Sequence, residues 1–183
     1  MIEKVLIVNI CKEKLSYFEF VKPIKDVLRK NNIKYSVKSY KEVKEKDLQE
    51  NNKIIICGTT IFDDEFLENV DKFEWLLDFK GSVLGICGGM HVIGLVFGGE
   101  LSKETEIGYY FEDFKEEFLG LNEKQEVYHL HNSYVDFNGL DFKIFAGEQV
   151  SQAVKHREKE VYGVLFHPEF RQKELILNFC NLK

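Results

Sequence analysis

The chain has 183 residues, 44% of them hydrophobic, which is enough for one domain with a buried core and too few for two large fused enzymes. Its formal net charge of −6 excludes the general nucleic-acid binders, which need a basic surface to displace counterions from phosphates. The apolar runs are much shorter than the roughly 20 residues that cross a bilayer, so no membrane partner is expected either.

The first half of the chain alternates short apolar strands with helical stretches, an order that is typical of a parallel sheet. Strands are expected over residues 4–10, 33–38, 53–57 and 82–86. Apolar stripes at helical spacing predict helices over residues 20–30 and 67–77, and a third helix runs from Cys87 to the Gly98-Gly99 pair.

From residue 126 onward, strand-like segments follow one another with short polar turns between them. They cover residues 127–131, 134–137, 142–146, 153–156 and 161–166, and a closing helix covers residues 173–181. The charged residues 157–160 are expected to form a hairpin turn. The predicted fold is a three-layer α/β domain with a mostly parallel central sheet flanked by helices and a β-rich C-terminal half that includes an antiparallel hairpin.

A cysteine stands at the centre of a glycine-rich turn, Gly-Ile-Cys-Gly-Gly at residues 85–89, between a predicted strand and a predicted helix. Glycines allow a sharp bend that a residue with a Cβ resists, so Cys87 is expected to project from the edge of the sheet. The N-terminus of the following helix directs backbone N–H groups and the positive end of its dipole at the sulfur, which favours the thiolate. The pattern indicates a nucleophile.

A histidine follows the last predicted strand in the sequence His-Pro-Glu at residues 167–169. The proline holds His167 in extended geometry, and a carboxylate at Glu169 can orient the imidazole and stabilise its charged form. Cys87, His167 and Glu169 therefore predict a hydrolytic site. A buried structural thiol with an unrelated histidine is the alternative.

The other cysteines, Cys11, Cys57 and Cys180, show neither C-x-x-C pairing nor metal-ligand spacing. With no signal-peptide core in the chain, they are expected to be reduced thiols of a cytoplasmic protein. His129 and His131 alternate on a strand and face one side, but no third ligand is spaced near them, so no metal is predicted. For His129, a position on a strand that is exposed to water is as strongly indicated as a role in a site.

Two motifs give the chain a family resemblance. Residues 85–91 (GICGGMH) and residues 162–169 (YGVLFHPE) resemble the two signatures of the class I glutamine amidotransferases. Residues 54–59 resemble the family's oxyanion strand, residues 106–108 its E-x-G, and residues 129–133 the segment that holds the amino-acid end of the substrate. The resemblance is nearly end to end and implies a single flavodoxin-like domain over residues 1–183. Length and spacing most resemble free-standing glutaminase subunits, particularly that of two-subunit GMP synthase.

The resemblance implies hydrolysis of L-glutamine to glutamate and ammonia through a γ-glutamyl thioester, with ammonia passed to a separate synthetase subunit. It implies no cofactor. The implied catalytic residues are Cys87, His167 and Glu169. The implied oxyanion hole comprises Gly58, Thr59 and Gly88, and the implied substrate-binding residues are His91, His131, Asn132 and Ser133.

Two positions depart from the family pattern. His91 stands where the family usually has glutamine, and Gly58-Thr59-Thr60 stands where it usually has Gly-Gly-Pro. A β-branched residue adopts unusual backbone angles less easily than glycine does. The departures keep two alternatives open: a γ-glutamyl hydrolase acting on another γ-glutamyl amide, and a degenerate, non-catalytic regulatory subunit.

Overall fold

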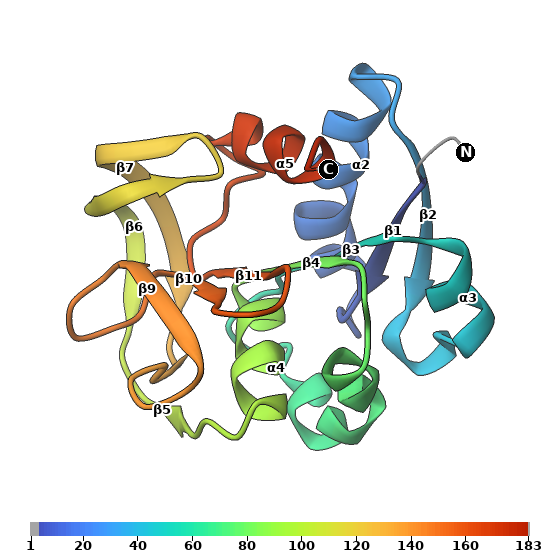
Figure 1. Ribbon diagram of the computed structural model, residues 1–183, viewed down its shortest axis with the longest axis horizontal. Coiled ribbons are helices and arrows are strands. Elements are labelled where there is room, and N and C mark those ends of the chain that lie inside the picture. Colours follow the sequence, from blue (N-terminus) through green and yellow to red (C-terminus); the bar gives the residue numbers. More distant parts are fainter. Residues whose placement is uncertain (1–3, 183) are drawn as a thin grey trace.

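A seven-stranded sheet is the centre of the computed structural model, which describes residues 4–182 (Figure 1). Its spatial order is β2 (Lys34–Ser39), β1 (Lys4–Asn9), β3 (Lys53–Ile56), β4 (Ser82–Ile86), β11 (Val161–Val164), β10 (Ala153–His156) and β9 (Phe142–Ala146). The first five strands are mutually parallel, whereas β10 pairs antiparallel with both of its neighbours. The predicted fold class and the hairpin turn at residues 157–160 are confirmed.

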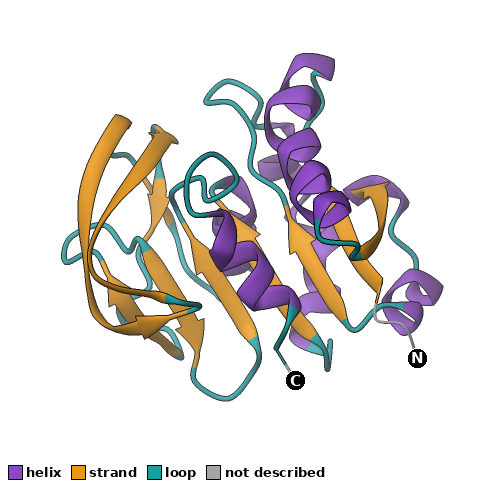
Figure 2. Ribbon diagram, turned by 90° about the horizontal axis from the view of Figure 1, so that it is seen from above, coloured by secondary structure: helices purple, strands orange, loops and turns teal. Residues whose placement is uncertain are grey.

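Helices cover both faces of this sheet (Figures 1 and 2). On one face lie α5 (Lys173–Cys180) and a long helix composed of α1 (Lys14–Ser16), the π-helical turn η1 (Tyr17–Val21) and α2 (Lys22–Lys30). On the other face lie α4 (Gly88–Val96) and the 3₁₀ turns of η3 (Glu65–Leu77), while the 3₁₀ turn η2 (Tyr40–Glu42) and α3 (Glu45–Glu50) follow β2. The result is the three-layer arrangement expected from the alternating pattern.

The first two helices differ from their predicted form. The first begins at Lys14 rather than at residue 20. Its opening turns were not predicted because Leu15 and Phe18 are exposed and do not extend the apolar stripe. The second, η3, is a series of 3₁₀ turns with a kink at Asn69. Its buried Phe73 and Leu76 are three residues apart, which matches the 3₁₀ period and leaves Leu77, expected in the core, 43% exposed.

Strands β6 (Glu106–Phe118) and β7 (Leu121–His131) form a long hairpin beside the β9 edge of the central sheet (Figure 1). Only residues 127–131 of this hairpin were predicted to form a strand. Eight of the fifteen residues from 112 to 126 are charged, so the sequence there shows no clear period-two alternation of apolar and polar residues. The turn uses Leu119 and Gly120 at φ 48° and 88°, the two positive angles of a type I′ turn. Leucine is an uncommon residue for that position. A short pair, β5 (Leu101–Ser102) with β8 (Tyr134–Val135), lies nearby.

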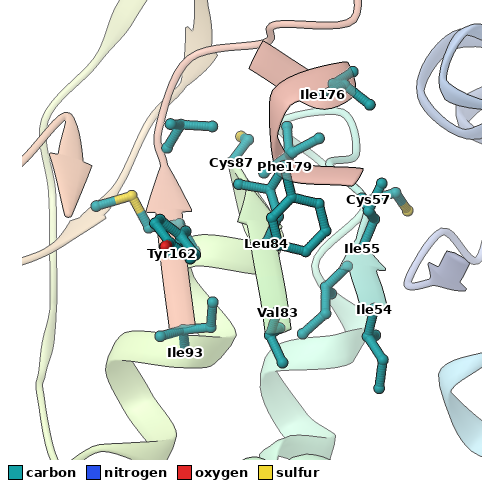
Figure 3. Packing of buried hydrophobic residues seen from close by; sticks show 14 of the residues in the cluster. Ile54, Ile55, Cys57, Val83, Leu84, Cys87, Ile93, Tyr162, Ile176 and Phe179 are labelled. Atoms are coloured by element: carbon teal, nitrogen blue, oxygen red, sulfur yellow. The ribbon is translucent and has the colours of Figure 1, made fainter. Parts of the chain in front are cut away.

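The central strands β3 and β4 lie within the core, and all of their residues are buried. Figure 3 shows Leu84 and Ile55 packed beneath Phe179 of α5, which fulfils the expectation that the closing helix covers the sheet. Cys57 and Cys180 are buried in this core, as small apolar residues would be. Within residues 4–182, no helix has the length and apolar character needed to traverse a bilayer.

Candidate active site

Three neighbouring parallel strands, β3, β4 and β11, end at one edge of the sheet, and each is followed by a segment that carries predicted site residues. Gly58 and Thr59 follow β3, Cys87 follows β4, and His167 follows β11. Because the carboxyl ends of parallel strands share an edge, the topology collects residues that are up to 109 positions apart in the chain, from 58 to 167.

Cys87 occupies the turn between β4 and α4 in a strained backbone conformation, with φ 49° and ψ −106°. Its N–H donates to the carbonyl of Val164 at 2.8 Å, and its own carbonyl accepts from the N–H of His91 at 3.0 Å. Such angles are rare for a residue with a side chain and persist only where the surroundings hold them. Here β11 on one side and the first turn of α4 on the other hold them.

His167 and Glu169 form a fully buried pair. Nδ1 of His167 lies 2.8 Å from Oε1 of Glu169, so the ring donates its Nδ1 proton to the carboxylate. The backbone N–H of His167 donates to the carbonyl of Tyr128 at 2.9 Å, and Phe20 packs on the ring with centroids 5.0 Å apart. Nε2 makes no hydrogen bond to any residue in 4–182 and is free for proton transfer.

Gly58 shows that Cys87 and His167 share one location. A Cβ at position 58 would lie 2.7 Å from Cε1 of His167 and 3.3 Å from Cβ of Cys87, so the bare backbone lies against both. The thiol itself donates to the carbonyl of Leu130, at 3.6 Å, rather than to the imidazole. Catalytic hydrogen bonds are often long or poorly aligned before substrate binds. Here the Cys87 thiol lies close to the His167 imidazole but forms no hydrogen bond with it.

The pKa of His167 reflects opposing effects. Burial lowers it, but the charges of Glu169 and Cys87 and the hydrogen bond to Glu169 raise it, and the balance raises the pKa to about 10. The imidazole is therefore charged at neutral pH. A charged imidazole beside a cysteine can act as an acid for the leaving group.

The backbone around the thiol offers candidate oxyanion donors. Gly88 is the first residue of α4, and an N–H at that position has no partner within the helix. Thr59 is 5% exposed and does not have positive φ, so the β-branched residue carries no left-handed strain where the family usually has glycine. The departure at Thr59 is thus compatible with an unstrained loop.

A cleft of about 740 Å³ opens beside Cys87. Predicted site residues from three separate segments line this cleft: Thr59, Gly88, His91, His131, Asn132 and Ser133. Nε2 of His91 donates to the carbonyl of Ser133 at 3.0 Å, which ties α4 to the loop after β7. Burial, and then the nearby charge of His131, lower the pKa of His91 to about 4, so its ring is neutral at physiological pH.

Two buried or half-buried acids near the cleft were not predicted as site residues. The carboxylate of Asp63 accepts the N–H groups of Lys12 and Glu13 at 3.1 Å, which fastens the loop after β1 to the loop after β3. Oε2 of Glu106 lies 2.9 Å from Nε2 of His131. His129, for which exposure was an alternative, is fully buried. Asp63 has no local sequence signal, whereas Glu106 belongs to the E-x-G resemblance; the partners of both acids come from distant segments.

Comparisons with known proteins identify similar sequences. The family model described as glutamine amidotransferase class-I matches residues 15–179. One subunit of the glutamine-hydrolyzing GMP synthase of Pyrococcus abyssi is 32% identical over 131 residues, which cover 63% of this chain and 70% of that one. The corresponding GMP synthase subunit of Methanococcus aeolicus is 30% identical over 117 residues, covering 58% of this chain and 62% of that one.

A solved structure has the same fold over nearly the whole chain. It is a putative GMP synthase subunit from Thermoplasma acidophilum, with a TM-score of 0.86 and 21% identity, and the match covers 98% of this chain and 93% of that one. A glutamine amidotransferase from Thermotoga maritima matches with a TM-score of 0.72 and 20% identity, over 92% and 77% of the two chains. At these identities the likeness shows the fold alone.

Proposed function

The chain belongs to the class-I glutamine amidotransferase family, and from this premise we propose that it is a glutaminase subunit that hydrolyses L-glutamine to glutamate and ammonia. One observation carries the proposal: a cysteine on a strained strand-to-helix turn lies beside a buried His–Glu pair at the edge of an open cleft. Such a constellation suits acyl transfer from an amide. The proposed domain is one unit over residues 1–183.

In the proposed reaction, the Cys87 thiolate attacks the side-chain carboxamide carbon of glutamine. The backbone N–H groups of Gly88 and of Thr59, in the loop that starts at Gly58, stabilise the oxyanion, and each such donor is worth about 3 to 4 kcal/mol in known sites. Charged His167, oriented by Glu169, gives its Nε2 proton to the departing ammonia, which leaves a γ-glutamyl thioester.

Water completes the cycle. His167, now neutral, removes a proton from water as it attacks the thioester carbonyl, and collapse of the second tetrahedral intermediate releases glutamate and returns the thiolate. The step needs Nε2 to face the reaction centre, which agrees with its lack of any other partner among the described residues.

The amino-acid end of glutamine is proposed to bind where His131, Asn132 and Ser133 line the cleft. The Ser133 carbonyl accepts from His91 with one lone pair and retains a second for the substrate's α-ammonium group. His91 would then position the loop through this hydrogen bond. The side-chain amide of the glutamine that the family usually has at this position could donate the same hydrogen bond.

Ammonia is proposed to pass to a separate synthetase subunit, with GMP formation as the reaction that consumes it. The names of the similar proteins, which are subunits of GMP synthase, support this proposal. So does an apolar stripe on β6, where Ile107, Tyr109 and Phe111 are 54%, 60% and 63% exposed, since exposed apolar patches are typical of protein contacts.

Replacement of the nucleophile tests the proposal. In the assembled enzyme, Cys87→Ala should abolish glutamate release and glutamine-dependent synthesis, because no thioester can form. The same complex supplied with ammonium salt should still make product, which controls for folding and for partner binding. Glutamate release by Cys87→Ala at the wild-type rate would contradict the assignment.

A further inference from the structure

Three side chains of the kinds that ligate metal ions converge at the base of the β6–β7 hairpin. Glu106 is the first residue of β6, and it pairs in register with His131, the last residue of β7, two residues after His129. Oε2 of Glu106 lies 2.9 Å from Nε2 of His131 and 3.6 Å from Nδ1 of His129. The two ring nitrogens are 3.3 Å apart. Three potential ligand atoms thus face one another at the corners of a small triangle.

The size and chemistry of this triangle fit one ion. Tetrahedral Zn²⁺, with bonds of about 2.0–2.2 Å, places its ligand atoms about 3.3–3.6 Å apart, close to the separations in the triangle. Two imidazole nitrogens and one carboxylate oxygen form a donor set that suits zinc, whereas Mg²⁺ and Ca²⁺ prefer all-oxygen shells. Three protein ligands leave one position for water, and His131 lies on the wall of the cleft, which offers a route for entry.

Surrounding side chains hold the three donors in place. Oε1 of Glu112 lies 3.2 Å from Nε2 of His129, on the side of the ring away from the triangle, although the two atoms do not form a hydrogen bond. A carboxylate on this side of the ring is where the outer partner of a zinc-bound imidazole is usually found. Nε2 of Gln152 donates to Glu106 at 2.6 Å and orients that carboxylate. Both histidines are almost completely buried, so their rings have little freedom to turn away.

We propose that Glu106, His129 and His131 bind a zinc ion that joins the base of the hairpin. The ion would fix His131 and therefore the loop of Asn132 and Ser133, which follows it and lines the cleft. The site would thus stabilise the hairpin and the substrate-facing loop from outside the cysteine centre. This proposal goes beyond the glutaminase function and does not rest on it.

Titration of the purified full chain with zinc chloride tests the proposal. One ion per chain is expected to bind at micromolar concentration, measured by calorimetry and by metal analysis after gel filtration. Glu106→Gln and His129→Asn should abolish that binding, while Glu112→Gln should weaken it by about 10- to 100-fold, as loss of an outer partner does. Glu106→Gln is nearly isosteric and partly exposed, so it guards against a result that reflects misfolding.

His156→Asn is the matched control, because His156 is also buried but lies outside the cluster, where its Nδ1 accepts the N–H groups of Glu158 and Lys159. This variant should bind zinc as the wild type does. If it lost the ion along with Glu106→Gln, the loss would reflect general destabilisation and the assignment would fall.

The thiols are the competing location for zinc, since Cys11 and Cys57 have sulfur atoms 4.0 Å apart and Cys87 is a candidate nucleophile. Cobalt substitution separates the two. Cobalt on nitrogen and oxygen ligands should show only the visible bands of a tetrahedral ion, whereas thiolate ligation adds a sulfur-to-metal charge-transfer band in the near ultraviolet. That band, or the absence of any stoichiometric binding, would overturn the proposal. Neither result would bear on glutamine hydrolysis, which has its own assay.

Discussion

His91 occupies a position at which a neutral donor is needed and a charged one is costly. Its Nε2–H donates to the Ser133 carbonyl, and burial lowers the pKa of the ring to about 4. Between that value and the ordinary pKa near 6.5, the unfolded chain binds a proton that the folded chain does not. This histidine therefore makes the fold less stable as pH falls through that interval.

His91→Gln should remove this acid sensitivity while retaining an N–H donor toward Ser133. Near pH 7.5 the two proteins should have similar free energies of unfolding, but near pH 4.5 the variant should be more stable than the wild type by about 2–3 kcal/mol. Urea unfolding at both pH values measures the difference. An equal loss of stability on acidification in the two proteins would show that His91 is not the group responsible.

At the residue scale, local motifs were sufficient to predict the catalytic candidates. Glycine-flanked Cys87 and proline-flanked His167 each have neighbours in the sequence that dictate their backbone geometry. The partners that arrive from elsewhere were not predictable: the Leu130 carbonyl that receives the thiol, and Glu106 against His131. These contacts depend on the β6–β7 register, which no local pattern specifies.

The element that presents Cys87, helix α4, depends on its close approach to the sheet. A Cβ at Gly89 would lie 2.3 Å from the carbonyl oxygen of Ile56, a backbone atom that cannot move away. A Cβ at Gly88 would lie 2.8 Å from the terminal methyl of Ile10 and 3.0 Å from the edge of Phe66, which are side-chain ends that can shift. Two adjacent glycines of one helix thus differ in how replaceable they are.

Gly89→Ala should therefore lower the free energy of unfolding by about 2–3 kcal/mol, because the helix must separate from β3. Gly88→Ala should cost less than about 1 kcal/mol, since the intrinsic preference of alanine for helix offsets part of the crowding. Thermal and urea unfolding of both variants provide the comparison. A Gly88→Ala variant less stable than Gly89→Ala would contradict the packing described for α4.

At the element scale, burial decided what the sequence could predict. The boundaries of β4 and α5 agree with the pattern to within a residue, because their apolar residues face the core at regular spacing. Near the tip of the β6–β7 hairpin, residues 115–117 and 122–124 are all exposed, so alternation is weak there, and the turn lacks the usual asparagine–glycine pair. The helix over residues 67–77 was predicted, but its 3₁₀ form was not, because 3₁₀ turns follow a period of three.

At the scale of the whole molecule, one buried lysine joins the central sheet to the C-terminal end of the described chain. Nζ of Lys53, on β3, donates to the carbonyls of Cys180 at 2.7 Å and Leu182 at 2.6 Å, at the last turn of α5 and just beyond it. Lys53 is 3% exposed. Its charge lies at the C-terminal end of a helix, where the dipole favours a cation.

Lys53→Met should lower the free energy of unfolding by about 2–3 kcal/mol, because buried carbonyls lose a charged donor. The rate of amide hydrogen exchange should increase by a larger factor in α5 than in β1. Lys143→Met is the surface control: its Nζ lies 2.6 Å from Glu116, but the side chain is 41% exposed and the pair is worth under about 1 kcal/mol. Equal losses in the two variants would contradict the role given to Lys53.

Glutamine hydrolysis by this chain requires a reactive thiolate at Cys87 with the imidazole of His167 beside it. Its most direct test is covalent labelling with a chloroketone analogue of glutamine, followed by intact mass and peptide mapping, with the proposed partner present and absent. One adduct is predicted, on Cys87, with the free thiols of Cys11, Cys57 and Cys180 unlabelled in the same molecule as internal controls. Labelling at any of those three instead, or no labelling even in the assembled complex, would contradict it.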